Sequence, residues 1–232
     1  MIRPRPAAER GLTQIDWLDS RHTFSFNQYY DPEHMGFRGL RVINDDRVAP
    51  GAGFGMHGHR DMEILTWMLA GEIEHRDSSG GGGILRAGEL QYMCAGTGIR
   101  HSEMNPSLTT PVHLLQIWIQ PDRSGYPPGY AQRSFAEETA TGGLRLIASP
   151  DGAEGSMPIH QDAKVLVAKL GAGDRAVYTP EAERGIWIQV GLGAISVNGT
   201  RLVAGDGAAI TGESSLNLEA SEAAELLLFD LK

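Results

Sequence analysis

Short runs of hydrophobic and β-branched residues recur along the whole chain. They have the composition of β-strands and are bounded by Gly, Asp, Asn or Pro. No segment keeps a helical period for more than about ten residues, so we expect few helices. The pattern therefore predicts an all-β protein of the sandwich or barrel type. The runs are LRVIND (40–45), EILTWML (63–69), VHLLQIWIQ (112–120), AKVLVAKL (163–170), RGIWIQVGLGAISVNG (184–199) and AELLLFDLK (224–232).

Two parts of the chain share one pattern. WMLAGEIEHRDSSGGGGILRAGELQYMCAG (67–96) and WIQVGLGAISVNGTRLVAGDGAAITG (187–212) both read as an aromatic strand, a turn, and a hairpin that ends in Ala-Gly-acid. The alignment places Trp67 opposite Trp187 and predicts two copies of one small β-barrel. Asn198-Gly199 is a hairpin-turn signal, and the glycine run 80–83 is interpreted as the turn of the first copy.

The segment QPDRSGYPPGYAQRSF (120–135) is dense in Pro, Gly and Tyr and is interpreted as the connection between the copies. We therefore expect an N-terminal domain over residues 1–125 and a C-terminal domain over residues 126–232.

Composition narrows the function classes. The 232 residues carry a formal net charge of −9, which argues against a nucleic-acid surface. A single cysteine, Cys94, excludes an intrachain disulfide framework and fits a reducing compartment. The first residues lack the apolar stretch of a secretory signal, and no run approaches the length of a membrane span. We expect a cytoplasmic protein that binds neither nucleic acid nor membrane.

The spacing of the histidines suggests a metal-binding site. His57 and His59 are separated by one glycine, and His101 and Glu103 are separated by one serine. Residues i and i+2 of a strand point to the same side, so each pair can face a barrel interior. The second copy has no histidine at the matching positions. Three imidazoles and a carboxylate suit Fe, Mn, Cu, Ni or Zn better than Ca or Mg. Glu63 has the parity of His57 and His59 on an unbroken strand, so it competes with Glu103 for a ligand position.

The remaining histidines are interpreted as structural. His113 shares a face with Leu115, Ile117 and Ile119, which is typical of a core histidine with a satisfied hydrogen bond. His22, His34, His75 and His160 have no partner at ligand spacing and are interpreted as surface or hydrogen-bonding residues.

The motifs around these residues resemble a known family. The run from Gly51 through His57, His59 and Glu63 to Gly71 is similar to the first cupin motif, and the run from Gly88 through His101 to Asn105 is similar to the second. The second run lacks the proline of the general cupin pattern. HTFSFNQYYDPEHMGFRGLRVINDD, HGHRDMEI and AGTGIRHSEMN resemble signatures of the pirin family over the whole chain.

The resemblance implies a bicupin: two jelly-roll barrels in tandem, with one divalent metal in the N-terminal barrel only. It implies His57, His59, His101 and Glu103 as ligands, Glu63 outside the ligand set, and Fe(II) as the metal. Several bacterial pirins are quercetin 2,3-dioxygenases, whereas other members are regarded mainly as transcriptional cofactors. The resemblance therefore implies a small aromatic, flavonol-like substrate and O2 as partners, with ring opening and loss of carbon monoxide.

Two functions follow from the same ligands. In the first, the metal lowers the pKa of a flavonol hydroxyl and Glu103 also accepts a proton. In the second, the protein is a metal-dependent regulator that binds a protein partner without turnover. A wide apolar pocket would favour the enzyme, and a closed site beneath a flat surface would favour the binding protein.

Overall fold

The computed structural model describes residues 1–139 and 142–232, and β-strands dominate it. Contacts between residues divide the chain into two compact units. The N-terminal unit consists of Gly11–Gly36 and Leu40–Ala136, and the C-terminal unit consists of Met1–Arg10, Phe37–Gly39 and Glu137–Lys232. Helix within the described residues is limited to α1 (Ala136–Thr139), η1 (Ala7–Glu9) and η2 (Ala153–Gly155).

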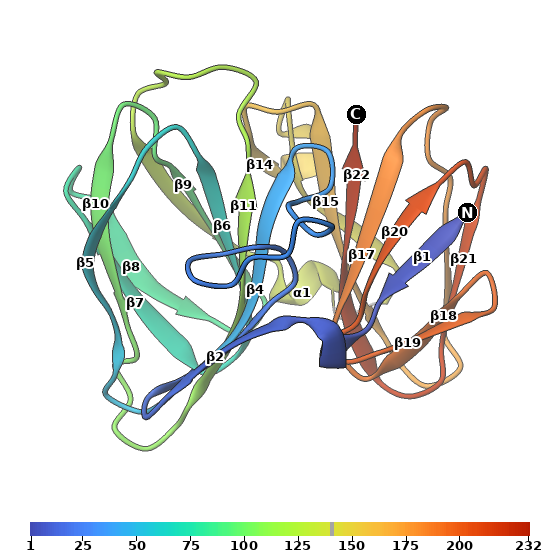
Figure 1. Cartoon of the computed structure of the whole chain (residues 1–232), viewed down its shortest axis with the longest axis horizontal. Helices are drawn as coiled ribbons and strands as arrows, with labels where there is room; N and C mark the ends of the chain where they lie inside the picture. The colour runs from blue at the N-terminus through green and yellow to red at the C-terminus, as the bar shows by residue number, and fades with distance from the viewer. Residues whose placement is uncertain (140–141) are drawn as a thin grey trace. The chain divides into compact units, whose positions relative to one another are not determined.

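The N-terminal unit is built from two antiparallel sheets (Figure 1). The larger sheet has the order β12-β9-β6-β11-β4-β3-β2, and the smaller has the order β5-β10-β7-β8. Met68 and Leu114 of the larger sheet pack with Ile73 and Leu85 of the smaller sheet, so the core lies between the two sheets. The strands are β2 (Gly11–Ile15), β3 (Leu18–His22), β4 (Leu40–Val48), β5 (Gly53–His59), β6 (Glu63–Ala70), β7 (Glu72–Asp77), β8 (Gly82–Arg86), β9 (Glu89–Cys94), β10 (Ile99–Met104), β11 (Val112–Ile119) and β12 (Gly129–Ser134).

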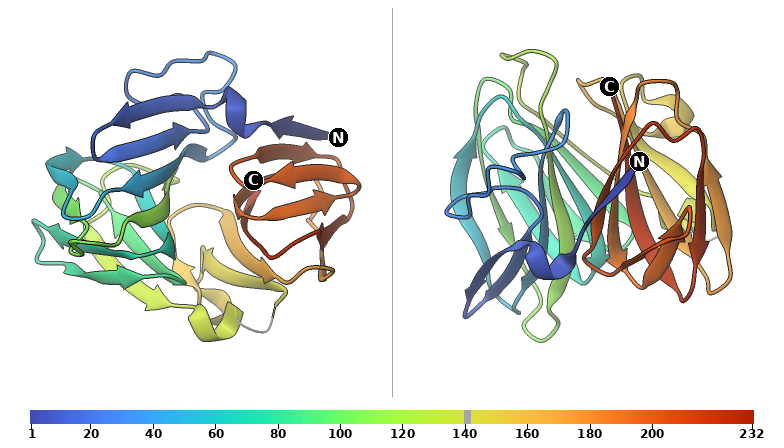
Figure 2. Two further views of the ribbon diagram at one scale, coloured as in Figure 1. Left: turned by 90° about the horizontal axis from the view of Figure 1, so that it is seen from below. Right: turned by 45° about the vertical axis from the view of Figure 1, so that its right-hand side comes forward.

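The C-terminal unit repeats this plan. Its larger sheet has the order β1-β20-β17-β22-β15-β13-β14, and its smaller sheet has the order β16-β21-β18-β19. Seen from below in Figure 2, each unit curls around its own interior. The strands are β1 (Ile2–Arg5), β13 (Leu144–Ser149), β14 (Met157–Pro158), β15 (Ala163–Leu170), β16 (Arg175–Tyr178), β17 (Gly185–Leu192), β18 (Ala194–Val197), β19 (Thr200–Val203), β20 (Gly207–Thr211), β21 (Leu216–Ala220) and β22 (Ala224–Leu231).

The predicted repeat is confirmed strand by strand. The order β9-β6-β11-β4 in one unit corresponds to β20-β17-β22-β15 in the other. Likewise, β5-β10-β7-β8 corresponds to β16-β21-β18-β19. Trp67 on β6 and Trp187 on β17 are both buried, but the expected alignment of one with the other is wrong by two residues. Backbone bonds from Gly88 to Met68 and from Gly205 to Val190 match the two units, so Gln189 is the residue that corresponds to Trp67. Each hydrophobic run read from the sequence forms a strand, and Asn198 and Gly199 join β18 to β19 with positive φ angles of 47° and 82°.

The units differ at three segments from the domains expected at 1–125 and 126–232: residues 1–10 and 37–39 belong to the C-terminal unit, and residues 126–136 belong to the N-terminal unit. The end of the expected connection forms β12, whose residues Gly129–Ser134 pair with Cys94–Glu89 of β9. At the other end of the chain, β1 pairs with β20 as an edge strand of the C-terminal unit. Residues 124–129 are rich in proline and glycine, but the chain forms a paired strand again in β12, which begins at Gly129.

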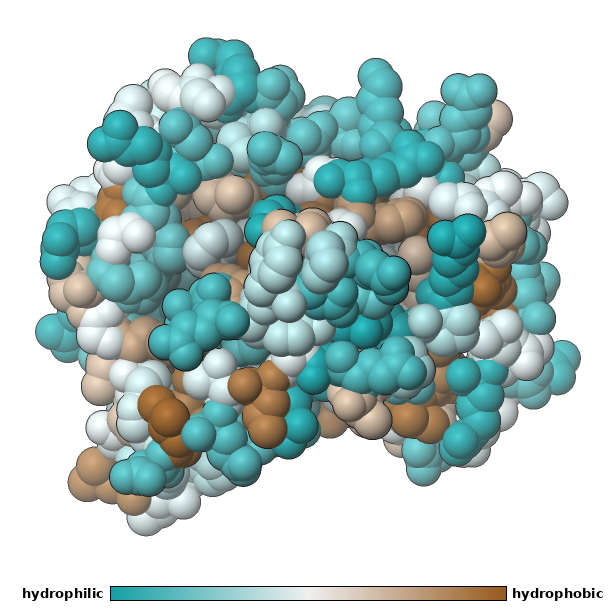
Figure 3. Space-filling view, viewed as in Figure 1, coloured by the Kyte–Doolittle hydropathy of each residue, from teal (hydrophilic) through white to brown (hydrophobic). Residues whose placement is uncertain are grey.

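The face drawn in Figure 3 is mostly hydrophilic, and its hydrophobic residues are scattered among polar ones. Within the residues that the structure describes, no helix is long and apolar enough to cross a membrane.

Candidate metal centre

Strands β5 and β10 run side by side (Figure 1). Three histidines converge where these two strands pair. His57 lies opposite His101 in the antiparallel register, and His59 lies opposite Ile99. The ring centroids are 4.8 Å apart for His57 and His59, 4.4 Å for His57 and His101, and 4.9 Å for His59 and His101. One ring nitrogen from each residue lies within 4.8 Å of the others. The predicted pairing of the two histidine motifs is therefore present in space.

The hydrogen bonds and the burial of these rings suit metal binding. Nδ1 of His57 lies 2.8 Å from the carbonyl oxygen of Gly55 and donates to it, which leaves the lone pair on Nε2. Nε2 of His101 is buried and has no hydrogen-bond partner among the described residues. Burial, and then the neighbouring His57, lower the pKa of His59 to about 4 and that of His101 to about 2. Neutral imidazoles with free lone pairs fit a divalent transition metal.

Glu103 lies on the buried side of His101. The register of β10 with β5 shifts between these two residues, because β5 has one more residue than β10 in this stretch. The Glu103 carboxylate is almost fully buried. It accepts hydrogen bonds from Nε2 of Gln116 at 3.0 Å and from Oγ1 of Thr66 at 3.5 Å. Burial raises the pKa of Glu103 to about 7. A carboxylate oxygen of Glu103 and one ring nitrogen each of His75 and His101 lie within 4.8 Å of one another, so His101 belongs to both groups.

Glu63 lies on a different sheet from the histidines. The chain leaves β5 at His59 and turns at Asp61, whose φ is 49°, before β6 begins at Glu63. The expectation that Glu63 points to the same side as His57 and His59 required one unbroken strand through all three residues, and that strand is absent. Glu63 is buried and accepts a 2.6 Å hydrogen bond from the hydroxyl of Tyr92.

A cavity of about 380 Å³ opens beside the histidines. His57 and His59 form part of its wall, together with the aromatic residues Trp118 and Phe26. The Trp118 ring contacts His59 with centroids 5.0 Å apart and contacts Phe26 at 5.3 Å. The rest of the lining mixes aromatic and polar side chains: Thr13, Trp17, Leu18, Ser20, His22, Asn27, Asn44, Asp46, Phe54 and Gln116, with Gly53 and Gly55.

Three other histidines are buried and hydrogen-bonded. His113 is buried and bonded to Asp45 at 2.8 Å, as expected of a core histidine. His22 is buried, bonded to Asn44 at 2.8 Å, and lines the cavity. His75 is fully buried beside His101, and its spacing to Asp77, two residues along one strand, was the available signal.

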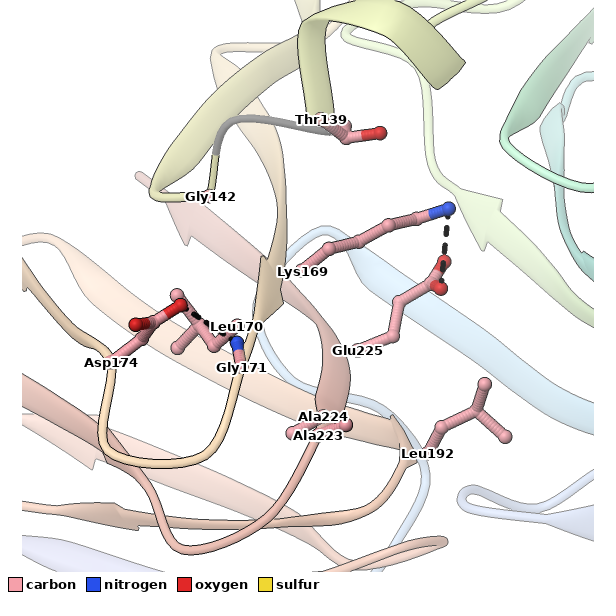
Figure 4. A pocket seen from close by; sticks show the side chains of 10 residues that line it. All are labelled: Thr139, Gly142, Lys169, Leu170, Gly171, Asp174, Leu192, Ala223, Ala224 and Glu225. Carbon is pink, nitrogen blue, oxygen red and sulfur yellow. Dashed lines mark hydrogen bonds and ion pairs between the residues drawn. The ribbon is translucent and has the colours of Figure 1, made fainter.

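The C-terminal unit has apolar residues where the N-terminal unit has His101 and Glu103. β21 pairs with β16 as β10 pairs with β5, but Leu216 and Leu218 of β21 are buried in the hydrophobic core. A cavity of about 590 Å³ in this unit contains a 3.4 Å ion pair between Lys169 and Glu225 (Figure 4). Its described lining has neither imidazole nor thiol, so it lacks the donors of a transition-metal site.

The chain was compared with known proteins. A family model described as Pirin matches residues 5–119, and one described as Quercetinase C-terminal cupin domain matches residues 146–231. A relative named quercetin 2,3-dioxygenase, from Escherichia coli K12, is 50% identical over 231 residues, which cover 100% of this chain and 99% of the relative. The chain belongs to the pirin family. Its two units are accordingly the cupin barrels of a bicupin.

Other pirins are similar to this chain along its full length. The Pirin-like protein of Caulobacter vibrioides is 41% identical over 232 residues, which cover 99% of each chain. The crystal structure of the E. coli pirin YhhW in complex with nickel(II) superposes with a TM-score of 0.94 at 50% identity, covering 100% of this chain and 99% of that one. The nickel(II) in that crystal structure is bound by YhhW.

Proposed function

We propose that this pirin, a metal-dependent dioxygenase, opens the ring of quercetin-like flavonols with O2. The observation that carries the proposal is the position of His57 and His59: they belong to the imidazole cluster and also line the aromatic cavity of about 380 Å³. That volume is in the range of small-molecule sites. A flat aromatic molecule can therefore lie between aromatic walls while its polar edge reaches the cluster. The relative named quercetin 2,3-dioxygenase supports this choice of substrate.

We assign one divalent metal per chain to His57, His59, His101 and Glu103. The convergence of the three imidazoles supports the histidines, and the carboxylate of Glu103 next to His101 supports the fourth position. A bound metal would act as a Lewis acid that lowers the pKa of a coordinated hydroxyl group. Fe(II) is the metal proposed for the cell, and Mn, Ni, Cu and Zn suit the same donors.

Side chains of the cavity orient the substrate, and Glu103 accepts its proton. Trp118 and Phe26 offer ring faces and edges to an aromatic ligand. The buried His22, held by Asn44 and Thr13, offers polar atoms at the cavity wall. Glu103 is proposed to accept the proton of the flavonol hydroxyl, with its carboxylate held by Gln116. Both atoms of O2 enter the products, which are the ring-opened ester and carbon monoxide.

The cavity favours this function over that of a regulator that binds a protein without turnover. Both functions need the same ligands, but a regulator has no need of an aromatic cavity that is walled in part by two of them. The cavity wall combines aromatic rings with polar side chains that can orient a ligand, as small-molecule sites do.

The proposal is tested by metal reconstitution. Metal-free protein is loaded separately with Fe(II), Mn, Ni, Cu and Zn, and the loss of quercetin absorbance is followed together with O2 uptake. We expect equal consumption of the two, abolished in His101→Ala. His34→Ala is the matched control, because it removes an imidazole that pairs with Asp31 instead of joining the cluster. Full metal occupancy without turnover by any metal would overturn the proposal and leave the regulator as the better account.

A further inference from the structure

A chain of buried hydrogen bonds lies behind His101. On the paired strands β7 and β10, His75 is opposite Glu103 and Asp77 is opposite His101. The Nδ1 atoms of His75 and His101 are 3.3 Å apart, and Nε2 of His75 is 3.0 Å from Oδ2 of Asp77. The side chains of His75 and Asp77 have no exposed surface, and neither does His101. Solvent therefore does not compete for these bonds.

The Asp77 carboxylate is fixed by the turn that follows β7. Its Oδ1 atom accepts hydrogen bonds from the backbone nitrogens of Ser79 at 2.8 Å and Gly81 at 3.0 Å. The hydroxyl of Ser79 donates a third bond to the same atom at 2.6 Å. Oδ2 is therefore the oxygen that faces His75. Because an ionised carboxylate only accepts hydrogen bonds, the proton between the two residues belongs to Nε2 of His75.

This arrangement determines which nitrogen of His101 carries its proton. A neutral His75 ring that is protonated on Nε2 has a lone pair on Nδ1, which must accept from Nδ1 of His101. His101 then keeps its own lone pair on Nε2, the buried atom that has no partner among the described residues. The ring of His75 is held in plane by Tyr130, with centroids 4.6 Å apart and an interplanar angle of 16°.

We propose that His75 and Asp77 are positioning residues that hold His101 in the tautomer with a free Nε2 lone pair, and that they thereby raise the affinity of the centre for a divalent transition metal. This rests on the proposed assignment of His101 as a ligand. Partners that orient a ligating histidine typically change metal affinity by about 10- to 100-fold. Neither residue is expected to touch the substrate.

Asp77→Asn gives the sharpest test, because it alters the chain of bonds without touching His101. Three donors surround the Oδ1 position, so the oxygen of the new amide stays there and its NH2 group faces His75. The NH2 group donates to Nε2 of His75, which moves that proton to Nδ1. His75 must then donate to Nδ1 of His101, and His101 becomes protonated on Nε2. We expect nitrogen-15 NMR of the metal-free protein to show this change of tautomer, and chelator competition to show Zn(II) or Ni(II) bound about 10- to 100-fold more weakly.

Matched variants separate this effect from general damage. Asp45→Asn makes the same change beside His113, a buried histidine outside the centre, and should leave the His101 tautomer and the metal affinity unchanged. If Asp77→Asn does not fold, His75→Asn and His75→Leu replace it. The asparagine can place an acceptor oxygen near the former Nδ1 and should retain most of the affinity, whereas the leucine should lose it.

Two outcomes would overturn the proposal: an unchanged His101 tautomer in Asp77→Asn, or metal affinities of His75→Leu and wild type within about twofold of each other. Both measurements are made without substrate. A pirin that fails to turn over quercetin but shows the tautomer change would contradict the proposed function and leave this inference standing.

Discussion

Glu63 and Glu103 are both buried, and their positions in the sequence allowed either to ligate a metal. Their contacts differ. Glu63 is engaged by the hydroxyl of Tyr92 at 2.6 Å, on the sheet opposite the histidine strands. Glu103 shares a group of closely spaced donor atoms with His101 and is held by amide and hydroxyl donors. At the scale of the residue, the position of Glu103 beside His101 is therefore the basis for proposing Glu103, and not Glu63, as the carboxylate ligand.

This difference predicts opposite effects of two equivalent substitutions. Glu103→Gln removes the carboxylate of a proposed ligand, so metal content after purification should fall strongly. The Glu63→Gln variant should retain the metal of the centre. Its free energy of unfolding should fall by about 1–3 kcal/mol, because the substitution replaces a charged hydrogen bond with a neutral one. Elemental analysis and denaturant unfolding measure the two effects. Metal loss in Glu63→Gln with full occupancy in Glu103→Gln would reverse the assignment.

Among the elements, strands were more predictable than the contacts that join them. The hydrophobic run EILTWML and the Asn198-Gly199 turn are local signals, and both appear where expected. The pairing of β10 with β7 is not local, so the sequence could not reveal that His75 lies beside His101. β12 was missed for a related reason: its pairing with β9 depends on a distant partner, and the adjacent prolines and glycines indicated a connection.

The turn between β7 and β8 offers a test at the scale of the element. A Cβ atom on Gly81 would lie 2.4 Å from Oδ2 of Asp77 and 2.7 Å from Cβ of Tyr130, so Gly81→Ala must displace one of them. Gly80 has a φ of 90° and open space around it, so Gly80→Ala costs only backbone strain of about 1–2 kcal/mol. We expect both variants to melt earlier, and only Gly81→Ala to bind Zn(II) more weakly. Equal metal affinities in chelator competition would contradict this.

At the scale of the whole molecule, the two units share one order of strands but carry different residues on it. The N-terminal unit places imidazoles on β5 and β10, whereas the C-terminal unit fills the equivalent region with leucines on β21. The repeat and its loss of histidines could be read from the sequence, because both are properties of residue order. The size of the cavity could not, since Trp17, Phe26 and Trp118 come from distant segments that meet only in the fold.

A buried ion pair makes the stability of the C-terminal unit testable separately from the metal centre. The Arg184 guanidinium donates to the carboxylate of Asp230, which is 1% exposed and also accepts from Tyr178 at 2.5 Å. Arg184→Met leaves that carboxylate without its cation and should cost about 3–5 kcal/mol in the free energy of unfolding. All proposed ligands lie in the N-terminal unit, so Zn(II) affinity measured below the unfolding transition should stay within about twofold of wild type.

The pH dependence of this substitution has a definite sign. The hydrogen bond and charge of Arg184 hold the pKa of Asp162 below its ordinary value of 3.8. A lowered pKa in the folded state contributes stability above about pH 4, and this contribution is lost as the pH falls through the folded-state value. In Arg184→Met this contribution is smaller, because only Lys232 remains to lower the pKa of Asp162. The difference in unfolding free energy between wild type and variant should therefore shrink between pH 6 and pH 3, as urea titrations can measure; a difference that grows on acidification would contradict the ion-pair account.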